Sequence, residues 1–298
     1  MKNNASKREY PASSRLGLAI LCFSILILFG CVNREVTLSD SVPEIDKTQE
    51  AKILTAFFGL DNALTPQALA IHWSTPGKDG MPLVFSLEID PGTLDPGDFE
   101  VISMDGTLFT PDVVSLLPAR EAYELRTVLL IGEYGNHPDN PPVSVKIVDD
   151  LLSRTGVNFK GQFLSVIPLE EGPILSYAEY FSFTEDYPYV DSGNGCDCPK
   201  EKTKQVVKAV WSGGVRAVNG EELGDNELGS FEITLMQDSD TIKVSPFQLA
   251  DLGDNDNNTD LCLDEIGVPV LLKIKGGIAI DPRGDVNPAT QIPIVSRW

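Results

Sequence analysis

Short apolar runs alternate with turn residues from about residue 81 onward. The run Met81–Asp90 is followed by a Pro-Gly turn, and Asp98–Met104 alternates apolar with polar positions before the dipeptide Asp105-Gly106. Alternation with a period of two is typical of a strand with one buried face. Similar runs predict further strands at 112–117, 124–131, 143–148, 162–167, 206–211, 231–236, 241–244 and 268–274.

Helical periodicity is scarce between these runs. Only Asp149–Arg154 and Pro246–Leu252 could form short helical turns. Short strands separated at regular intervals by turn residues favour antiparallel sandwiches. We therefore predict an all-β protein with two β-sandwich domains. The predicted bounds are 53–170 for the first sandwich, 171–199 for a linker or crossover with a cysteine-bearing loop, and 200–298 for the second sandwich.

The N-terminal segment differs from the rest of the chain. An apolar run from Leu16 to Gly30 follows several basic residues and ends at Cys31. This arrangement resembles the signal peptide and lipobox of bacterial lipoproteins. The resemblance implies that residues 1–30 are a signal peptide, that Cys31 is lipidated, and that 31–52 form a flexible tether. An uncleaved N-terminal anchor is the alternative. Val32, in place of Asp after the cysteine, resembles the pattern for sorting to the cell outer membrane.

The chain is strongly acidic, with a formal net charge of −21 over 298 residues. Residues 1–30 hold four basic and one acidic residue, so the remainder carries −24. A negative surplus of this size excludes nucleic acid as a partner, because the phosphate backbone would be repelled. We expect the partners to be the membrane, reached through the lipid anchor, and an unknown protein or glycan ligand at the cell envelope.

Export changes how the cysteines are interpreted, because outside the cytoplasm thiols form disulfides more often than metal sites. Once Cys31 is lipidated and the signal peptide is gone, Cys196, Cys198 and Cys262 remain. Cys196 and Cys198 are too close in sequence to bridge easily. We therefore predict that Cys262 pairs with one of these two.

An acidic segment late in the chain is a candidate calcium site. Asp254, Asp256, Asn258 and Asp260 stand at alternate positions, and Glu265 follows at the twelfth. Calcium prefers several oxygen ligands from one tight loop, often with a bidentate carboxylate at its end. Thr259 stands where such loops usually need glycine. The alternative is a loop of Asx turns without metal.

Several short motifs in the first predicted sandwich resemble the bacterial Ig-like modules of surface-layer and adhesin-type proteins. The resemblance implies that Phe85 and Phe99 point inward, that Asp90 and Asp98 cap turns, and that the module is a spacer, scaffold or binding domain rather than a catalyst. The motifs are Phe85-Ser86, Ile89-Asp90, Thr93-Leu94, Asp98-Phe99, Val101, Asp105-Gly106, the segment 145–153 and the segment 156–161.

Catalytic motifs are missing from the sequence: it has no Gly-x-Ser-x-Gly elbow, no His-Glu-x-x-His pair and no glycine-rich phosphate loop. We therefore expect a non-enzymatic binding, adhesion or scaffold protein, anchored by lipid in the cell envelope. The alternative is an exported hydrolase or carbohydrate-active enzyme that uses carboxylates of the loop Asp251–Glu265 as acid and base.

Overall fold

The computed structural model describes residues 50–121, 123–183, 196–238, 240–250, 253 and 256–297. These residues belong to one compact unit, which extends from Leu38 to Trp298. The predicted signal peptide, the lipidation site Cys31 and nearly all of the tether lie outside the described residues, as does Asp254.

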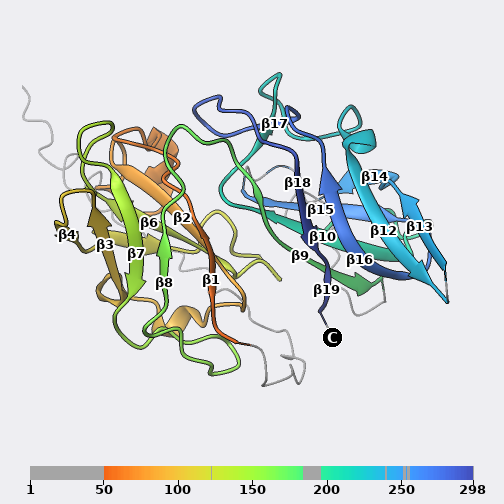
Figure 1. Cartoon of the computed structure of the whole chain (residues 1–298), viewed down its shortest axis with the longest axis horizontal. Helices are drawn as coiled ribbons and strands as arrows, with labels where there is room; N and C mark the ends of the chain where they lie inside the picture. Colours follow the sequence, from red (N-terminus) through yellow and green to blue (C-terminus); the bar gives the residue numbers. More distant parts are fainter. Residues whose placement is uncertain are drawn as a thin grey trace, which may run out of the picture. The chain divides into compact units, whose positions relative to one another are not determined.

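Two four-stranded antiparallel sheets make up the first sandwich (Figure 1). One sheet has the order β1 (Ile53–Ala56), β2 (Asp79–Phe85), β6 (Thr127–Gly132), β5 (Val113–Ser115). The other has the order β4 (Leu108–Phe109), β3 (Phe99–Ser103), β7 (Pro142–Ile147), β8 (Phe163–Ser165).

The core of the first sandwich follows from strand alternation. Phe99, Val101 and Ser103 of β3 are buried while the residues between them are only partly covered, so one face of the strand points inward. Phe85 and Phe99 are both buried in this core, and the Phe85 ring meets Phe159 edge-on at 5.0 Å between centroids.

Aspartates cap the turns between these strands. The Asp90 Oδ1 accepts a hydrogen bond from the Gly92 N–H at 2.9 Å, and the Asp98 Oδ2 accepts one from the Asp95 N–H at 2.8 Å. Such side-chain acceptors satisfy backbone donors that the turn leaves unpaired.

A five-stranded and a four-stranded sheet make up the second sandwich. The first has the order β14 (Gln248–Ala250), β15 (Asn258–Leu263), β10 (Gln205–Trp211), β9 (Leu175–Ser182), β19 (Val295–Ser296). The second has the order β13 (Asp240–Val244), β12 (Phe231–Gln237), β16 (Val268–Ile274), β18 (Thr290–Pro293). A small pair, β11 (Arg216–Ala217) and β17 (Ala279–Ile280), accompanies them. Only β19 pairs in parallel, with β9, among the described strands.

The all-β, sandwich-type prediction is confirmed, with strands at every position where the sequence predicted one. Both predicted helical turns were wrong. Residues 149–154 run through turns and bridges, and Gln248–Ala250 is strand β14, whose Leu249 joins the second core. Tertiary burial of one apolar side chain outweighs weak local helix propensity in such short segments. Helices in the described residues are short 3-10 turns, at Pro66–Ala70, Pro91–Thr93, Pro96–Asp98 and Leu228–Ser230.

None of the helices in the described segments is long and apolar enough to cross a membrane.

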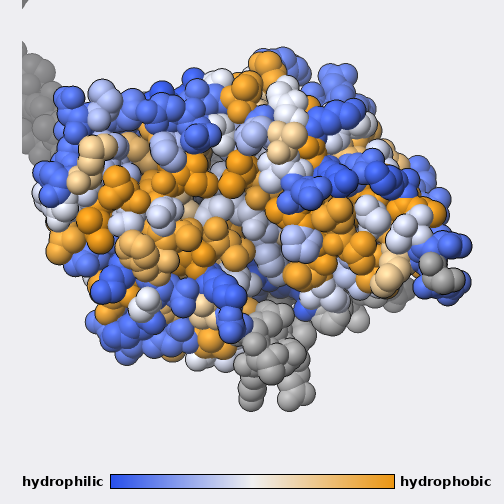
Figure 2. Space-filling view, in the orientation of Figure 1, coloured by the Kyte–Doolittle hydropathy of each residue, from blue (hydrophilic) through white to orange (hydrophobic). Residues whose placement is uncertain are grey.

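The segment 171–199, expected as a linker or crossover, contributes strand β9, whose Leu175 and Ala178 are buried in the second core. Over the face presented in Figure 2, apolar patches alternate with polar residues. Phe163 and Leu108 are each 57% exposed.

Asp79 is a buried carboxylate inside the first sandwich. Its oxygens accept hydrogen bonds from the backbone N–H groups of Asn62 at 2.8 Å and Tyr134 at 2.7 Å. Burial raises the pKa of Asp79 to about 6, although these two donors favour the ionised form.

This raised pKa predicts a pH-dependent stability. The folded state holds the Asp79 proton more tightly than the unfolded state, so the contribution is complete below the ordinary aspartate pKa and is lost as pH rises through about 6. Between pH 7 and pH 5 the wild type should gain about 1 kcal/mol relative to Asp79→Asn in urea unfolding. Parallel pH curves for the two proteins would contradict this account.

Candidate functional site

The five-stranded sheet of the second sandwich is buried on both faces. Every residue of β10 and β15 is buried. One face of β10 places Val207, Ala209 and Trp211 in the second core. Because strand side chains alternate, the opposite face carries Lys208.

Strand register places charges in a row on this second face. Lys208 of β10 lies opposite Asp260 of β15 on one side and Glu179 of β9 on the other. All three residues are at most 1% exposed. Buried charges need partners, and the chain supplies them from the first sandwich.

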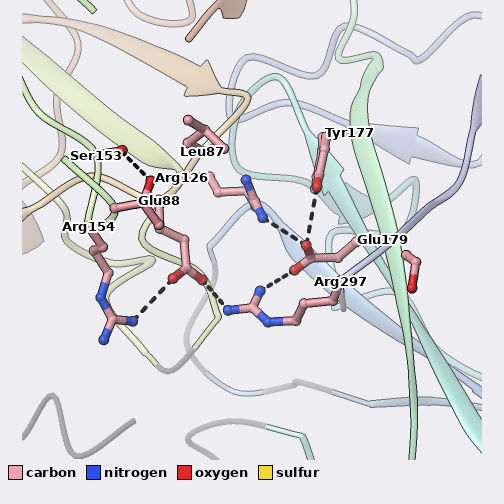
Figure 3. A pocket seen from close by; sticks show the side chains of 10 residues that line it. Leu87, Glu88, Arg126, Ser153, Arg154, Tyr177, Glu179 and Arg297 are labelled. Atoms are coloured by element: carbon pink, nitrogen blue, oxygen red, sulfur yellow. Dashed lines mark hydrogen bonds and ion pairs between the residues drawn. The ribbon is translucent and has the colours of Figure 1, made fainter. Parts of the chain in front are cut away.

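Glu179 is the centre of the larger cluster, shown in Figure 3. Its carboxylate accepts hydrogen bonds from Arg126 Nη2 at 2.8 Å, from Tyr177 Oη at 3.2 Å, and from Arg297 Nη1. Arg126 comes just before β6 in the first sandwich, whereas Arg297 follows β19 in the second. One carboxylate therefore joins both sandwiches.

Glu88 extends the same cluster into the first sandwich. It accepts hydrogen bonds from Arg297 Nη2 at 2.6 Å and from Arg154 Nη1 at 3.1 Å. The resulting chain of charges runs Arg154, Glu88, Arg297, Glu179, Arg126. No side chain in it is more than 9% exposed, so water screens these ion pairs little.

The aromatic rings of the cluster cover its guanidinium groups. The Arg297 guanidinium lies 3.7 Å from the Tyr123 ring centroid, and that of Arg126 lies 4.3 Å from the Tyr177 ring centroid. A guanidinium group donates its hydrogen bonds in its own plane, so its two faces are free to stack on an aromatic ring. Here the rings take the place of water on those faces.

Opposing effects set the pKa of Glu179. Burial raises it, but the positive charges of Arg126 and Arg297 outweigh burial and hold the pKa below its ordinary value. Burial lowers the pKa of Arg297, and the carboxylates of Glu179 and Glu88 outweigh this effect and raise it. Glu179 and Arg297 are therefore ionised at neutral pH.

Lys208 forms a second, smaller cluster. Its Nζ lies 2.9 Å from Glu124 Oε1 of the first sandwich and 3.2 Å from Asp260 Oδ1 of its own sheet. Neutral contacts join the sandwiches as well, since Asn257 Nδ2 donates to Thr127 Oγ1 at 2.9 Å. Together these contacts form a buried charged layer, by which we mean Glu88, Glu124, Arg126 and Arg154 of the first sandwich with Glu179, Lys208, Asp260 and Arg297 of the second.

Close backbone approach accompanies the charged layer. A Cβ added to Gly213 would lie 3.0 Å from Phe57 Cδ1 and 3.2 Å from Pro82 Cγ of the first sandwich. Any larger residue at position 213 would push against these atoms, so glycine permits the contact.

The cavity beside Glu88 and Glu179 is small, at about 20 Å³. That volume holds roughly one water molecule, whereas small-molecule sites enclose several hundred Å³. The charged groups around it are hydrogen-bonded to one another. These hydrogen-bonded ion pairs attach one sandwich to the other.

The structure joins Cys198 to Cys262 in a disulfide, so the predicted bridge to Cys262 is present. Both bridged cysteines belong to a buried apolar cluster that also contains Cys196, Phe181 and Val206. Val206 of β10 and Cys262 of β15 are cross-strand neighbours. Lys208 and Asp260 are the cross-strand pair two positions further along the same two strands.

The candidate calcium ligands are spread along a strand. Asp256 accepts hydrogen bonds from the Asn258 backbone N–H at 2.6 Å and side-chain Nδ2 at 2.7 Å, which is an Asx turn. Asp260 lies on β15 beside Lys208, and Glu265 is exposed beyond the end of the strand. Within the described segments, no group of three or more His, Cys, Asp or Glu side chains is arranged to hold a metal ion. Asp251 and Asp254 lie outside those segments.

A melting experiment decides between the calcium hypothesis and its alternative, a loop of Asx turns without metal. Because Asp256 already accepts from Asn258 and Asp260 already pairs with Lys208, we expect millimolar calcium to leave the melting temperature of the wild type unchanged. Calcium bound at about a hundred times its Kd would stabilise the fold by about 3 kcal/mol. An upward shift that Asp256→Ala removes, and that the control Asp285→Ala outside the segment 254–265 keeps, would establish the calcium loop instead.

No family model matches the sequence. No curated protein matches it either. Among solved structures, the chain is similar to the S-layer protein rSbsC, with a TM-score of 0.27 and 9% sequence identity over 83% of this chain and 54% of that one. The chain thus spans about half the length of that structure.

Sequence reasoning missed the charged layer, although a signal was present. Lys208 interrupts the apolar run 206–211, and Arg126 interrupts the run 124–131. A charge inside an otherwise apolar strand indicates either an exposed face or a buried partner. Their partners Asp260, Glu179 and Glu124 lie 52 to 84 positions away, so the sequence alone could not identify them.

Proposed function

We propose that this chain is a lipid-anchored cell-envelope protein whose two sandwiches act together as a non-enzymatic binding or scaffold module. The buried charged layer is the observation that carries the proposal. It fixes one sandwich against the other through Glu179, Arg297 and Glu88 instead of leaving them as independent domains. A fixed tandem suits a protein that holds a partner at a set distance from a surface.

The lipid anchor is part of this proposal, and it rests on the apolar run that ends at Gly30-Cys31. Replacing Cys31 by Ser removes the thiol that lipid would modify. The variant should leave the membrane fraction or accumulate as an uncleaved precursor, measured by cell fractionation and mass spectrometry. A Cys31→Ser protein that has the wild-type mature mass and partitions into detergent would contradict the lipoprotein assignment.

Binding without turnover is the second part, and it is tested on isolated cell envelopes. The protein should sediment with them saturably and release no soluble sugar or peptide fragments over time. The charge of the mature chain predicts that added salt changes this binding only where the partner is itself charged. Release of fragments in proportion to protein concentration would support an exported hydrolase instead.

A further inference from the structure

We propose that Lys208 and Asp260 form an intramolecular amide bond, with the Glu124 carboxyl group as the proton carrier. The bond would link β10 to β15 covalently. It would form only where the first sandwich places Glu124 against the second.

Geometry brings the reacting groups together. Lys208 and Asp260 are direct cross-strand neighbours in the antiparallel register. The Lys208 Nζ lies 3.2 Å from Asp260 Oδ1 and 2.9 Å from Glu124 Oε1. The amine is thus held against the carboxyl group whose Cγ it would attack, and holding two reacting groups in place turns a slow bimolecular reaction into a fast intramolecular one.

The surroundings exclude water. Side chains of Lys208, Glu124 and Asp260 are at most 1% exposed. Val206 and Cys262 are the next cross-strand pair on this face, and both belong to an apolar cluster with Tyr123 and Phe181. A site closed to water slows hydrolysis of the amide product.

The reaction balances without any further reagent. The ammonium of Lys208 transfers one proton to the Asp260 carboxylate, so an amine faces a carboxylic acid. The amine nitrogen attacks Asp260 Cγ and forms the N–C bond. Glu124 takes a second proton from the nitrogen and returns it to the departing hydroxyl, the C–O bond breaks, and one water leaves.

Mass spectrometry of the full-length protein tests the bond directly. After reduction, alkylation and trypsin digestion, residues 205–216 should remain uncut at Lys208 and be joined to residues 244–273, with a combined mass lower by one water. Glu124→Gln should fold, as seen by an unchanged circular dichroism spectrum, yet be cut at Lys208 and give three unlinked peptides, 205–208, 209–216 and 244–273. Lys208→Arg should also give separate peptides, because a guanidinium is not a nucleophile under these conditions.

An internal control comes from a matched pair at the surface. Lys243 Nζ lies 2.8 Å from Glu232 Oε1 across β13 and β12, but 61% and 42% of these side chains are exposed. This pair should stay unlinked, since water surrounds it. Cleavage at Lys208 in the wild type, with peptides 205–208, 209–216 and 244–273 all at their sequence masses, would overturn the inference and leave Lys208 as an ion-paired lysine only.

Discussion

Replacing Arg297 by Met should lower the free energy of unfolding by about 3–5 kcal/mol, because two buried carboxylates lose their shared partner. Glu88 and Glu179 would each keep one arginine, Arg154 and Arg126 respectively. Urea unfolding of the wild type and the variant measures the loss. Arg297→Lys should fall between them, since an ammonium supplies the charge but cannot donate to both carboxylates through a planar fork.

A matched substitution separates this effect from general loss of a cation. Lys243→Met removes an exposed ion pair with Glu232, and exposed pairs contribute little to stability. We expect no measurable change for that variant. An Arg297→Met protein as stable as Lys243→Met would show that the charged layer does not hold the sandwiches together.

Loss of the Cys198–Cys262 disulfide should cost about 4 kcal/mol, the chain-entropy value for closing a loop of this length. The bridged residues are 64 positions apart, and both are fully buried. The double variant Cys198→Ala, Cys262→Ala should therefore unfold at a clearly lower urea concentration. Both the parent and the double variant should also carry Lys208→Arg. The proposed Lys208–Asp260 amide would otherwise close part of the same loop and mask the loss of the disulfide.

Reduction provides the control for this prediction. A reducing agent should bring the Lys208→Arg protein down to the stability of its double cysteine variant and leave that variant unchanged. Cys196→Ala, in the same apolar cluster, should respond to reduction as its parent does. A parent whose stability does not change on reduction would contradict the predicted contribution of the bridge.

Much of the strand pattern could be predicted because burial of one face imposes a period of two. The runs 99–103 and 231–237 show this alternation in sequence and in burial alike. Segment 258–263 was predicted as part of a loop, because its Asn and Asp side chains are typical of turns. It is strand β15, and its polar side chains are satisfied by long-range partners such as Lys208.

The site itself could not be predicted from local patterns. Arg126 precedes β6 and Glu179 lies in β9, and only the docking of two sandwiches makes them partners. The disulfide was easier to predict, because the expected export of the chain and its odd number of cysteines left few pairings for Cys262. Local alternation of apolar and polar residues thus predicts most of the strands, whereas the charged layer depends on tertiary contacts.

Differential scanning calorimetry of the intact protein tests most directly whether the two sandwiches form one unit. The charged layer, with Glu179 bonded to Arg126 of one sandwich and Arg297 of the other, predicts a single transition with equal calorimetric and van't Hoff enthalpies. The Arg297→Met variant should show two resolved transitions. Two independent transitions in the wild type would contradict the account.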